Sequence, residues 1–204
     1  MNPEKEILPL FPLQSVLFPG GLLSLKVFEA RYLDLVSECL RHRKPFGVVC
    51  LRQGSEVQRP GEAQRFENAG VLAELTDVDG EQHGILRVRC IGQERFRLSA
   101  PTQSDNGLWH ASIERLAHDP KVLPTEALIP TVRALANAIA TLKQQGTKPF
   151  LEPYRFDDAG WVANRWCELL PVSLAAKQKL MELDDPLVRL QLVDEFLRGK
   201  GVVS

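Results

Sequence analysis

The spacing of apolar residues changes partway along the chain, at residues 117–124, which contain two prolines. Before this segment, short apolar runs such as residues 22–27 and 45–51 are bounded by glycine, proline or charged residues, as β-strands commonly are. After it, alanine, leucine and other strong helix formers dominate. The sequence therefore predicts an α+β fold, in which residues 1–118 form a β-rich part with one helix and residues 119–204 form an α-helical bundle.

The clearest strand pair is a hairpin whose two arms flank a loop at residues 79–82. In this register Leu75 lies opposite Leu86 on an apolar face, and Glu74 lies opposite Arg87 on the other face. A slip of one residue would mix the two faces. We therefore predict this pairing, with the second arm starting at residue 83.

Three further elements complete the β-rich part. Residues 32–40 carry apolar side chains at helical spacing and charged side chains on the opposite face, which predicts an amphipathic helix. Gly92 predicts a bulge or bend in the sheet. Residues 95–98 and 109–116 alternate in polarity and are predicted strands.

In the helical part, three polar residues mark the beginnings of helices. Asp158, Ser173 and Asp185 each precede a segment of helical periodicity, and Asp185 is followed by Pro186, a residue favoured in the first helical turn. An earlier helix is predicted over residues 132–142.

Length and charge exclude several classes of protein. The 204 residues are 44% hydrophobic, enough to bury a core without disulfides. The 25 basic and 26 acidic residues nearly balance, so the net charge does not attract the protein to nucleic acid or to an anionic membrane. The N-terminus lacks the basic-then-apolar order of a secretory signal, and no apolar run approaches the ~20 residues that span a bilayer. We expect a soluble cytoplasmic protein without a membrane partner.

The residues that most often bind metals are scattered. Neither the cysteines nor the histidines show the close spacing of a zinc site or a redox motif, so we expect no metal or cofactor and predict that the cysteines are buried free thiols. These residues are Cys39, Cys50, Cys90 and Cys167, with His42, His83, His110 and His118.

Catalytic motifs are also missing. The sequence has no Gly-x-x-x-x-Gly-Lys-Ser/Thr phosphate loop, no Gly-x-Ser-x-Gly elbow and no His-Glu-x-x-His helix. Ser173 and Lys177 are one residue too far apart for a Ser-x-x-Lys pair, and a helix cap explains the serine. We therefore expect no catalytic residue in this chain.

Several short motifs follow one another in a specific order. The chain carries Leu-Pro-Leu-Phe-Pro-Leu at 8–13, Phe-Pro-Gly-Gly at 18–21, Phe-Glu-Ala-Arg-Tyr at 28–32, Gly-x-x-Arg-Phe at 92–96 and Leu-Pro-Val-Ser at 170–173. Over residues 7–198 this order resembles the N-terminal, substrate-recognition domain of Lon proteases.

The resemblance implies a fold and a role. It implies a PUA-like β pseudo-barrel followed by helices, and binding of unfolded polypeptide or of a specific protein client. A Lon protease would continue into an ATPase and a Ser/Lys protease, so we expect a stand-alone, ATP-independent recognition module. Self-association is left open.

Two other functions compete with protein binding. PUA-like folds in other proteins bind RNA, and a row of arginines along consecutive strand segments could hold phosphates, although nearby acidic residues favour a salt-bridged surface and make nucleic acid the less favoured partner. A small-molecule site would instead need a closed apolar pocket. The arginines are Arg87, Arg89, Arg95 and Arg97.

Protein binding requires exposed apolar side chains. The candidates lie around the Pro-Gly-Gly turn, at the entrance of the predicted helix with its charged face, and after an Asn-Gly turn. They are Leu17, Phe18, Leu22, Phe28, Arg31, Asp34 and Trp109.

Overall fold

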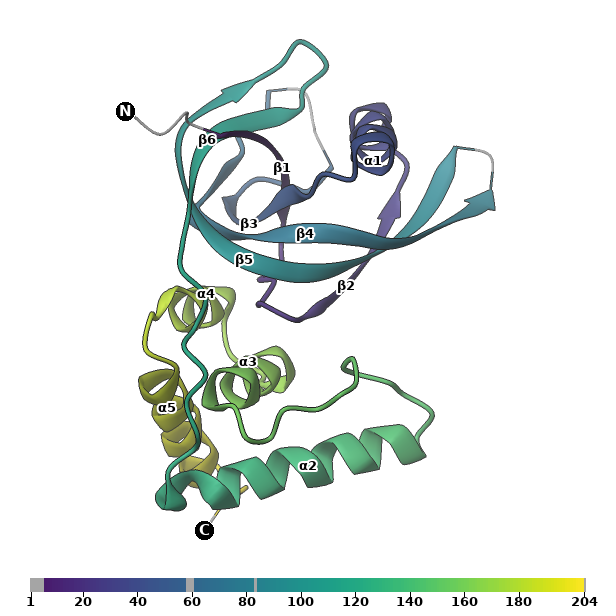
Figure 1. Ribbon diagram of the computed structural model, residues 1–204. Helices are drawn as coiled ribbons and strands as arrows, with labels where there is room; N and C mark the ends of the chain where they lie inside the picture. Colours follow the sequence, from purple (N-terminus) through teal and green to yellow (C-terminus); the bar gives the residue numbers. More distant parts are fainter. Residues whose placement is uncertain (1–5, 58–60, 83, 204) are drawn as a thin grey trace. The chain divides into compact units, whose positions relative to one another are not determined.

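The structure is a computed structural model that describes residues 6–57, 61–82 and 84–203 (Figure 1). The chain divides between Ala117 and His118 into two compact units, the N-terminal unit and the C-terminal unit. The described residues thus form an α+β protein.

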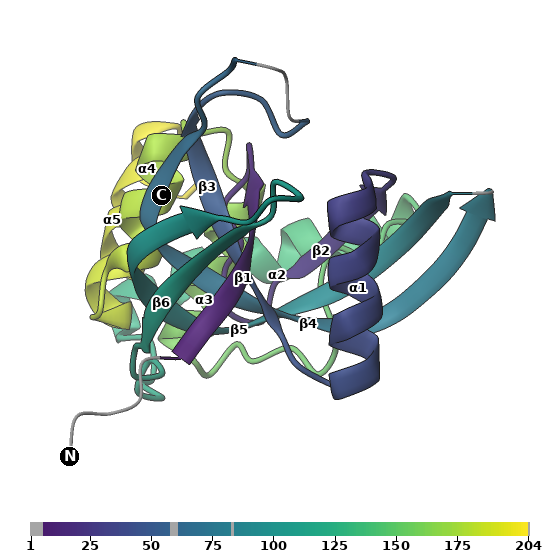
Figure 2. The same cartoon turned by 90° about the horizontal axis from the view of Figure 1, so that it is seen from above.

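The N-terminal unit combines six described strands with one helix, which Figure 2 shows from above. In the sheet order β2-β5-β4-β3-β1-β6, the last strand also pairs with β5, so the strands from β5 to β6 close into a ring. All neighbours are antiparallel except β1 and β3. The elements are β1 (Glu6–Leu13), β2 (Leu22–Val27), α1 (Ala30–His42), β3 (Phe46–Gln53), β4 (Arg65–Gln82), β5 (Ile85–Gln103) and β6 (Trp109–Arg115).

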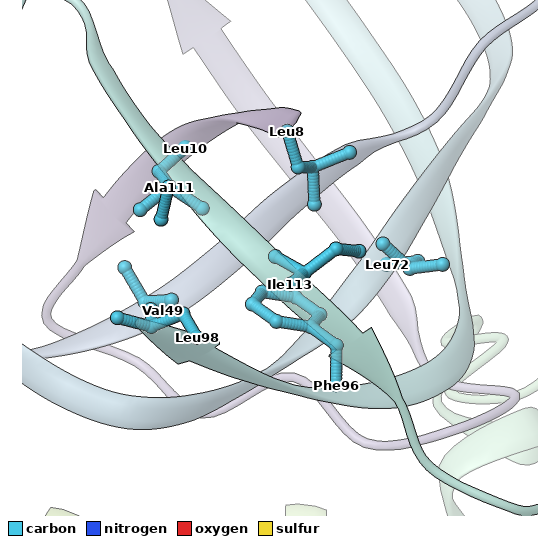
Figure 3. Close-up of a cluster of buried hydrophobic side chains, with 8 residues drawn as sticks. All are labelled: Leu8, Leu10, Val49, Leu72, Phe96, Leu98, Ala111 and Ile113. Carbon is cyan, nitrogen blue, oxygen red and sulfur yellow. The ribbon is translucent and has the colours of Figure 1, made fainter. Parts of the chain in front are cut away.

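A cluster of buried apolar side chains fills the ring of strands (Figure 3). Its members come from five different strands, so their burial stabilises the closed ring of strands. They are Leu8, Leu10, Val49, Leu72, Phe96, Leu98, Ala111 and Ile113. Helix α1 packs nearby through Tyr32, whose ring stacks on that of Phe11 with centroids 3.8 Å apart.

The predicted register of the β4–β5 hairpin is wrong by four residues at Leu75 and by five residues nearer the turn. Leu75 pairs with Cys90, while Leu86 pairs with Gly80. Strand β4 continues to Gln82, and the turn contains Gly84, whose φ of 79° favours glycine. Because side chains alternate with a period of two, the even shift around Leu75 keeps the same faces together, and the apolar pattern there could not distinguish the two registers. An irregularity between Leu75 and Asp77 then changes the offset by one residue.

This difference also changes the charge pairs. The predicted Glu74–Arg87 pair does not form: Arg87 lies 3.1 Å from Glu81, and Glu74 accepts a hydrogen bond from Gln93. His83, predicted to start the second arm, lies outside the described residues.

The bulge predicted at Gly92 is confirmed by a register shift between Val71 and Ala73, which pair with Arg95 and Gly92. Gly92 also exchanges backbone hydrogen bonds with the Pro-Gly-Gly turn, since its N–H donates to Gly21 O at 2.9 Å and its carbonyl accepts from Gly20 N at 2.7 Å. The glycine lets this turn approach the sheet.

The C-terminal unit contains α2 (Ile129–Gln144), α3 (Ala159–Leu169), α4 (Leu174–Glu182) and α5 (Pro186–Gly199), preceded by a short 3-10 turn, η1 (Glu126–Leu128). All three predicted caps are confirmed. Asp158 accepts from Gly160 N at 3.0 Å, Ser173 from Ala176 N at 3.2 Å and Asp185 from Leu187 N at 2.8 Å. Helices α3 and α5 lie side by side (Figure 1).

Candidate protein-binding surface

Three of the candidate binding residues are buried. Leu17 and Phe18 lie inside the N-terminal unit, and Phe18 has no exposed surface. Arg31 is buried at the start of α1, where its Nη1 donates to Gly107 O at 2.8 Å and its guanidinium lies 4.4 Å from the ring centroid of Tyr32. The hydrogen bond to Gly107 holds α1 against the loop between β5 and β6.

The other candidates reach the surface to different extents. Leu22 and Phe28 are 42% and 50% exposed, and Asp34 is exposed on α1. Trp109 is only half-buried, but its Nε1 donates to Gln64 Oε1 at 2.9 Å and its ring packs edge-on against a neighbouring phenylalanine. Leu22 and Phe28 are therefore the exposed apolar members of the predicted set.

Leu22 and Phe28 flank the same strand. Leu22 is the first residue of β2 and Phe28 follows its last, so about 20 Å of extended backbone separates them. Within the described part of the chain, β2 pairs with β5 alone, which leaves its outer edge open. An open edge presents unpaired N–H and C=O groups to a partner.

The four arginines do not form one basic row. Arg95 is buried, whereas Arg87 and Arg89 are exposed and lie 3.1 Å from Glu81 and 3.6 Å from Asp77. A hollow of about 320 Å³ beside β2 brings together three cationic side chains with Glu81. Its lining residues are Ser24, Leu25, Lys26, Glu81, Arg87 and Arg89. Glu81 and Asp77 offset part of this positive charge.

A larger groove lies between the beginning of β1 and helix α1. It has a volume of about 560 Å³, and none of its lining residues is among the candidates predicted from the sequence. Its lining residues are Glu6, Ile7, Leu8, Pro9, Leu35, Glu38, Cys39, His42, Lys44, Pro45 and Arg115. We call it the β1 groove.

The floor of the β1 groove is uncharged, whereas its rim carries charged side chains. Burial raises the pKa of the Cys39 thiol from its ordinary value of 9.0 to about 11, so the sulfur is a neutral, apolar part of the floor. At the rim, a hydrogen bond from Arg115 holds the pKa of Glu6 below its usual value. His42 Nε2 lies 3.2 Å from Glu38.

Within ranges 6–57, 61–82 and 84–203, no three His, Cys, Asp or Glu side chains gather as metal ligands. None of the helices described there is long and apolar enough to cross a membrane. All four cysteines are free and buried, which confirms that prediction.

Residues 7–199 match the family described as the ATP-dependent protease La (LON) substrate-binding domain. The chain belongs to the Lon substrate-binding domain family. This confirms the resemblance found in the sequence motifs.

Similar proteins support the assignment. The Lon-domain chain is 28% identical to the Lon protease of Anaeromyxobacter dehalogenans and 29% identical to Lon protease 2 of Myxococcus xanthus, over 95% and 96% of its length. It covers 23% and 24% of those proteins, so it spans about a quarter of the relatives it matches.

Solved structures share the fold of this Lon domain. The crystal structure of a Lon N-terminal domain protein from Xanthomonas campestris superposes with a TM-score of 0.72 at 31% identity, over 92% of this chain and 96% of that one. The N-terminal domain of the Mycobacterium avium complex Lon protease has a TM-score of 0.61 at 12% identity, over 93% and 97% of the two chains, which shows the fold alone.

Proposed function

We propose that this Lon domain recognises polypeptides, either unfolded segments or a specific protein client, through the outer edge of β2 and the two apolar side chains that flank it. The observation that carries the proposal is the exposure of Leu22 and Phe28 at the two ends of an open strand edge. An extended client along β2 would pair its backbone with the edge and bury both side chains.

The proposed role requires no catalysis by this chain. The match is to a substrate-binding domain, and the sequence lacks nucleotide-binding and peptidase motifs. We expect purified protein neither to hydrolyse ATP nor to cleave casein. Turnover that survives repurification and disappears in a point variant would contradict this. The four buried free thiols suit a reducing compartment such as the cytoplasm.

The test uses reduced, carboxymethylated α-lactalbumin as a permanently unfolded client. Leu22→Ser and Phe28→Ser should each weaken its binding, because burying one such side chain contributes about 1.5 to 3 kcal/mol, a ten- to hundred-fold change in affinity. The matched control is Leu40→Ser, which removes an equally exposed apolar side chain from α1. It should bind as the wild type does.

An RNA titration in the same experiment tests the competing function. Single-stranded RNA should bind weakly, and Arg87→Glu should leave client binding unchanged, since Arg87 already pairs with Glu81. If the serine variants bind the client normally while Arg87→Glu abolishes tight, salt-sensitive RNA binding, the domain is an RNA binder instead.

A further inference from the structure

The first half of β1 has a neighbour on one side only. On one side, Glu6 to Leu10 pair with β6. On the other side, parallel pairing with β3 begins only at Leu10, opposite Gly47. Within the described residues, Glu6–Pro9 therefore have no strand beside them on that side. This backbone edge borders the β1 groove.

Local geometry explains why β3 does not extend along this edge. Continuing the register would place Pro45 opposite Leu8, and proline has no N–H to donate to a ladder. Two residues earlier, Arg43 adopts the left-handed conformation with a φ of 50°, which ends helix α1 and turns the chain toward β3. The gap in the sheet is built into this connection.

The β1 groove combines an apolar floor with polar backbone and charged groups, so a purely hydrophobic ligand would match only part of it. Leu35 and Cys39 of α1 form a buried apolar floor, with Pro9 half-buried beside them. At the rim, Arg115 Nη2 lies 2.8 Å from Glu6 Oε1, so charges of both signs are already paired there. A ligand that fills the groove must form hydrogen bonds with the backbone edge and also cover the apolar floor.

We propose that the β1 groove binds an extended polypeptide segment as an added strand on Glu6–Pro9. An extended polypeptide offers alternating N–H and C=O groups to the edge while every second side chain enters the apolar floor. The volume of about 560 Å³ falls within the range of ordinary ligand sites. Glu6–Pro9 span about 13 Å, but Pro9 has no N–H and can offer this edge only its carbonyl, so the N–H donors come from within Glu6–Leu8.

This inference rests on the proposed polypeptide recognition but uses residues separate from Leu22 and Phe28. The two surfaces lie on different strands of the N-terminal unit, β1 and β2. One client could therefore engage one surface without the other, and variants at each surface test them independently.

The experiment uses the full chain and a capped seven-residue peptide, Ser-Val-Lys-Val-Glu-Val-Ser, followed by backbone amide NMR. Binding should shift the amide signals of Ile7, Leu8 and Lys44. Two further peptides carry N-methyl groups, one at its valines and the other at its lysine and glutamate. Because alternate amides of a strand point to opposite edges, one of these peptides should bind at least about fivefold more weakly and the other should bind as the parent does.

A pair of surface variants supports the peptide series. Ile7 is 70% exposed and lines the groove, so Ile7→Asp should weaken peptide binding at least about tenfold without unfolding the protein. Leu40, 52% exposed on α1, lies outside the lining, and Leu40→Asp should change the affinity less than twofold.

Several results would overturn the inference: no peptide binding, equal binding of all three peptides, equal loss for both methylated peptides, or signal shifts confined to β2. If unfolded α-lactalbumin still binds in a manner that depends on Leu22 and Phe28, the proposed function stands and only the β1 groove assignment fails. If neither peptide nor client binds, both proposals fail.

Discussion

Arg189 Nη1 lies 2.5 Å from Asp119 Oδ2, an ion pair that ties the segment before η1 to helix α5. The guanidinium is almost fully buried, with 1% of the side chain exposed. It also donates to Asn164 Oδ1 at 3.0 Å and to Leu180 O at 2.9 Å. A buried cation is tolerated because its donors have partners.

Asp119→Ala should therefore destabilise the protein strongly. The variant leaves the Arg189 charge buried without its carboxylate, which typically costs about 3 to 5 kcal/mol in the free energy of unfolding. Urea denaturation followed by circular dichroism measures the loss.

Lys121→Ala is the matched control. Lys121 Nζ lies 2.7 Å from Asp157 Oδ2, but both side chains are well exposed, so removing this pair should leave the free energy of unfolding nearly unchanged. Equal stability of the Asp119 and Lys121 variants would show that the buried ion pair does not hold this segment.

The close approach at Gly92 leads to a second prediction. A Cβ atom at this position would lie 2.3 Å from Phe18 O, a backbone atom that cannot move without displacing the Pro-Gly-Gly turn. Gly92→Ala should destabilise the protein by about 1 to 3 kcal/mol, the usual cost of overpacking. The free energy of unfolding in urea measures the effect.

Gly80→Ala provides the comparison within the same hairpin. Nothing lies within 4 Å of a Cβ atom built there, and Gly80 is in extended backbone within β4. The substitution should be neutral or slightly stabilising, because alanine restricts the unfolded chain. If both alanine variants unfold alike, the turn is not packed against Gly92.

Local signals were sufficient for much of the fold. The helix caps at Asp158, Ser173 and Asp185 depend on a side chain and the next few N–H groups, so they were predictable from neighbouring residues. The hairpin register was not, because the pattern around Leu75 is equally satisfied when the pairing shifts by an even number of residues.

The candidate binding surfaces could not be predicted from the sequence, because they depend on side-chain exposure and strand pairing. Phe18 and Phe28 both follow apolar residues, yet one is buried and the other half-exposed, because exposure depends on which strands meet. The β1 groove arises where β3 fails to continue along β1. The sequence contains Pro45, but this proline indicates a gap beside β1 only once β3 is known to pair with β1.

The buried thiols predict how stability depends on alkaline pH. Burial raises the pKa of Cys90 and Cys167 from 9.0 to about 12, and that of Cys39 and Cys50 to about 11. Above pH 9 the unfolded chain loses these protons while the folded protein keeps them. The free energy of unfolding should therefore be constant with respect to these groups below pH 9 and fall as the pH rises toward 11.

Urea denaturation with reductant at pH 8, 9 and 10 tests this dependence. Cys90→Ala removes one titrating group, so its stability should fall less steeply with pH, by about 1.4 kcal/mol per pH unit at most. Native protein at pH 8 should also react slowly with a thiol reagent, whereas urea-unfolded protein should react at all four cysteines. Rapid reaction of the native protein would contradict the burial of these thiols.

The last prediction separates stability from binding at two phenylalanines. Phe18 has no exposed surface, so Phe18→Ala should leave a cavity and reduce the free energy of unfolding by about 3 to 5 kcal/mol. Phe28 is half-exposed, and Phe28→Ala should reduce it by less than about 1 kcal/mol. Urea denaturation of the two variants gives both values, and the unfolded-client titration gives their affinities. We expect Phe28→Ala to bind more weakly while remaining folded, because its side chain is available to a partner. If Phe18→Ala is as stable as the wild type, the turn that carries Phe18 is not packed in the core, and Phe18 becomes as good a candidate for client contact as Phe28.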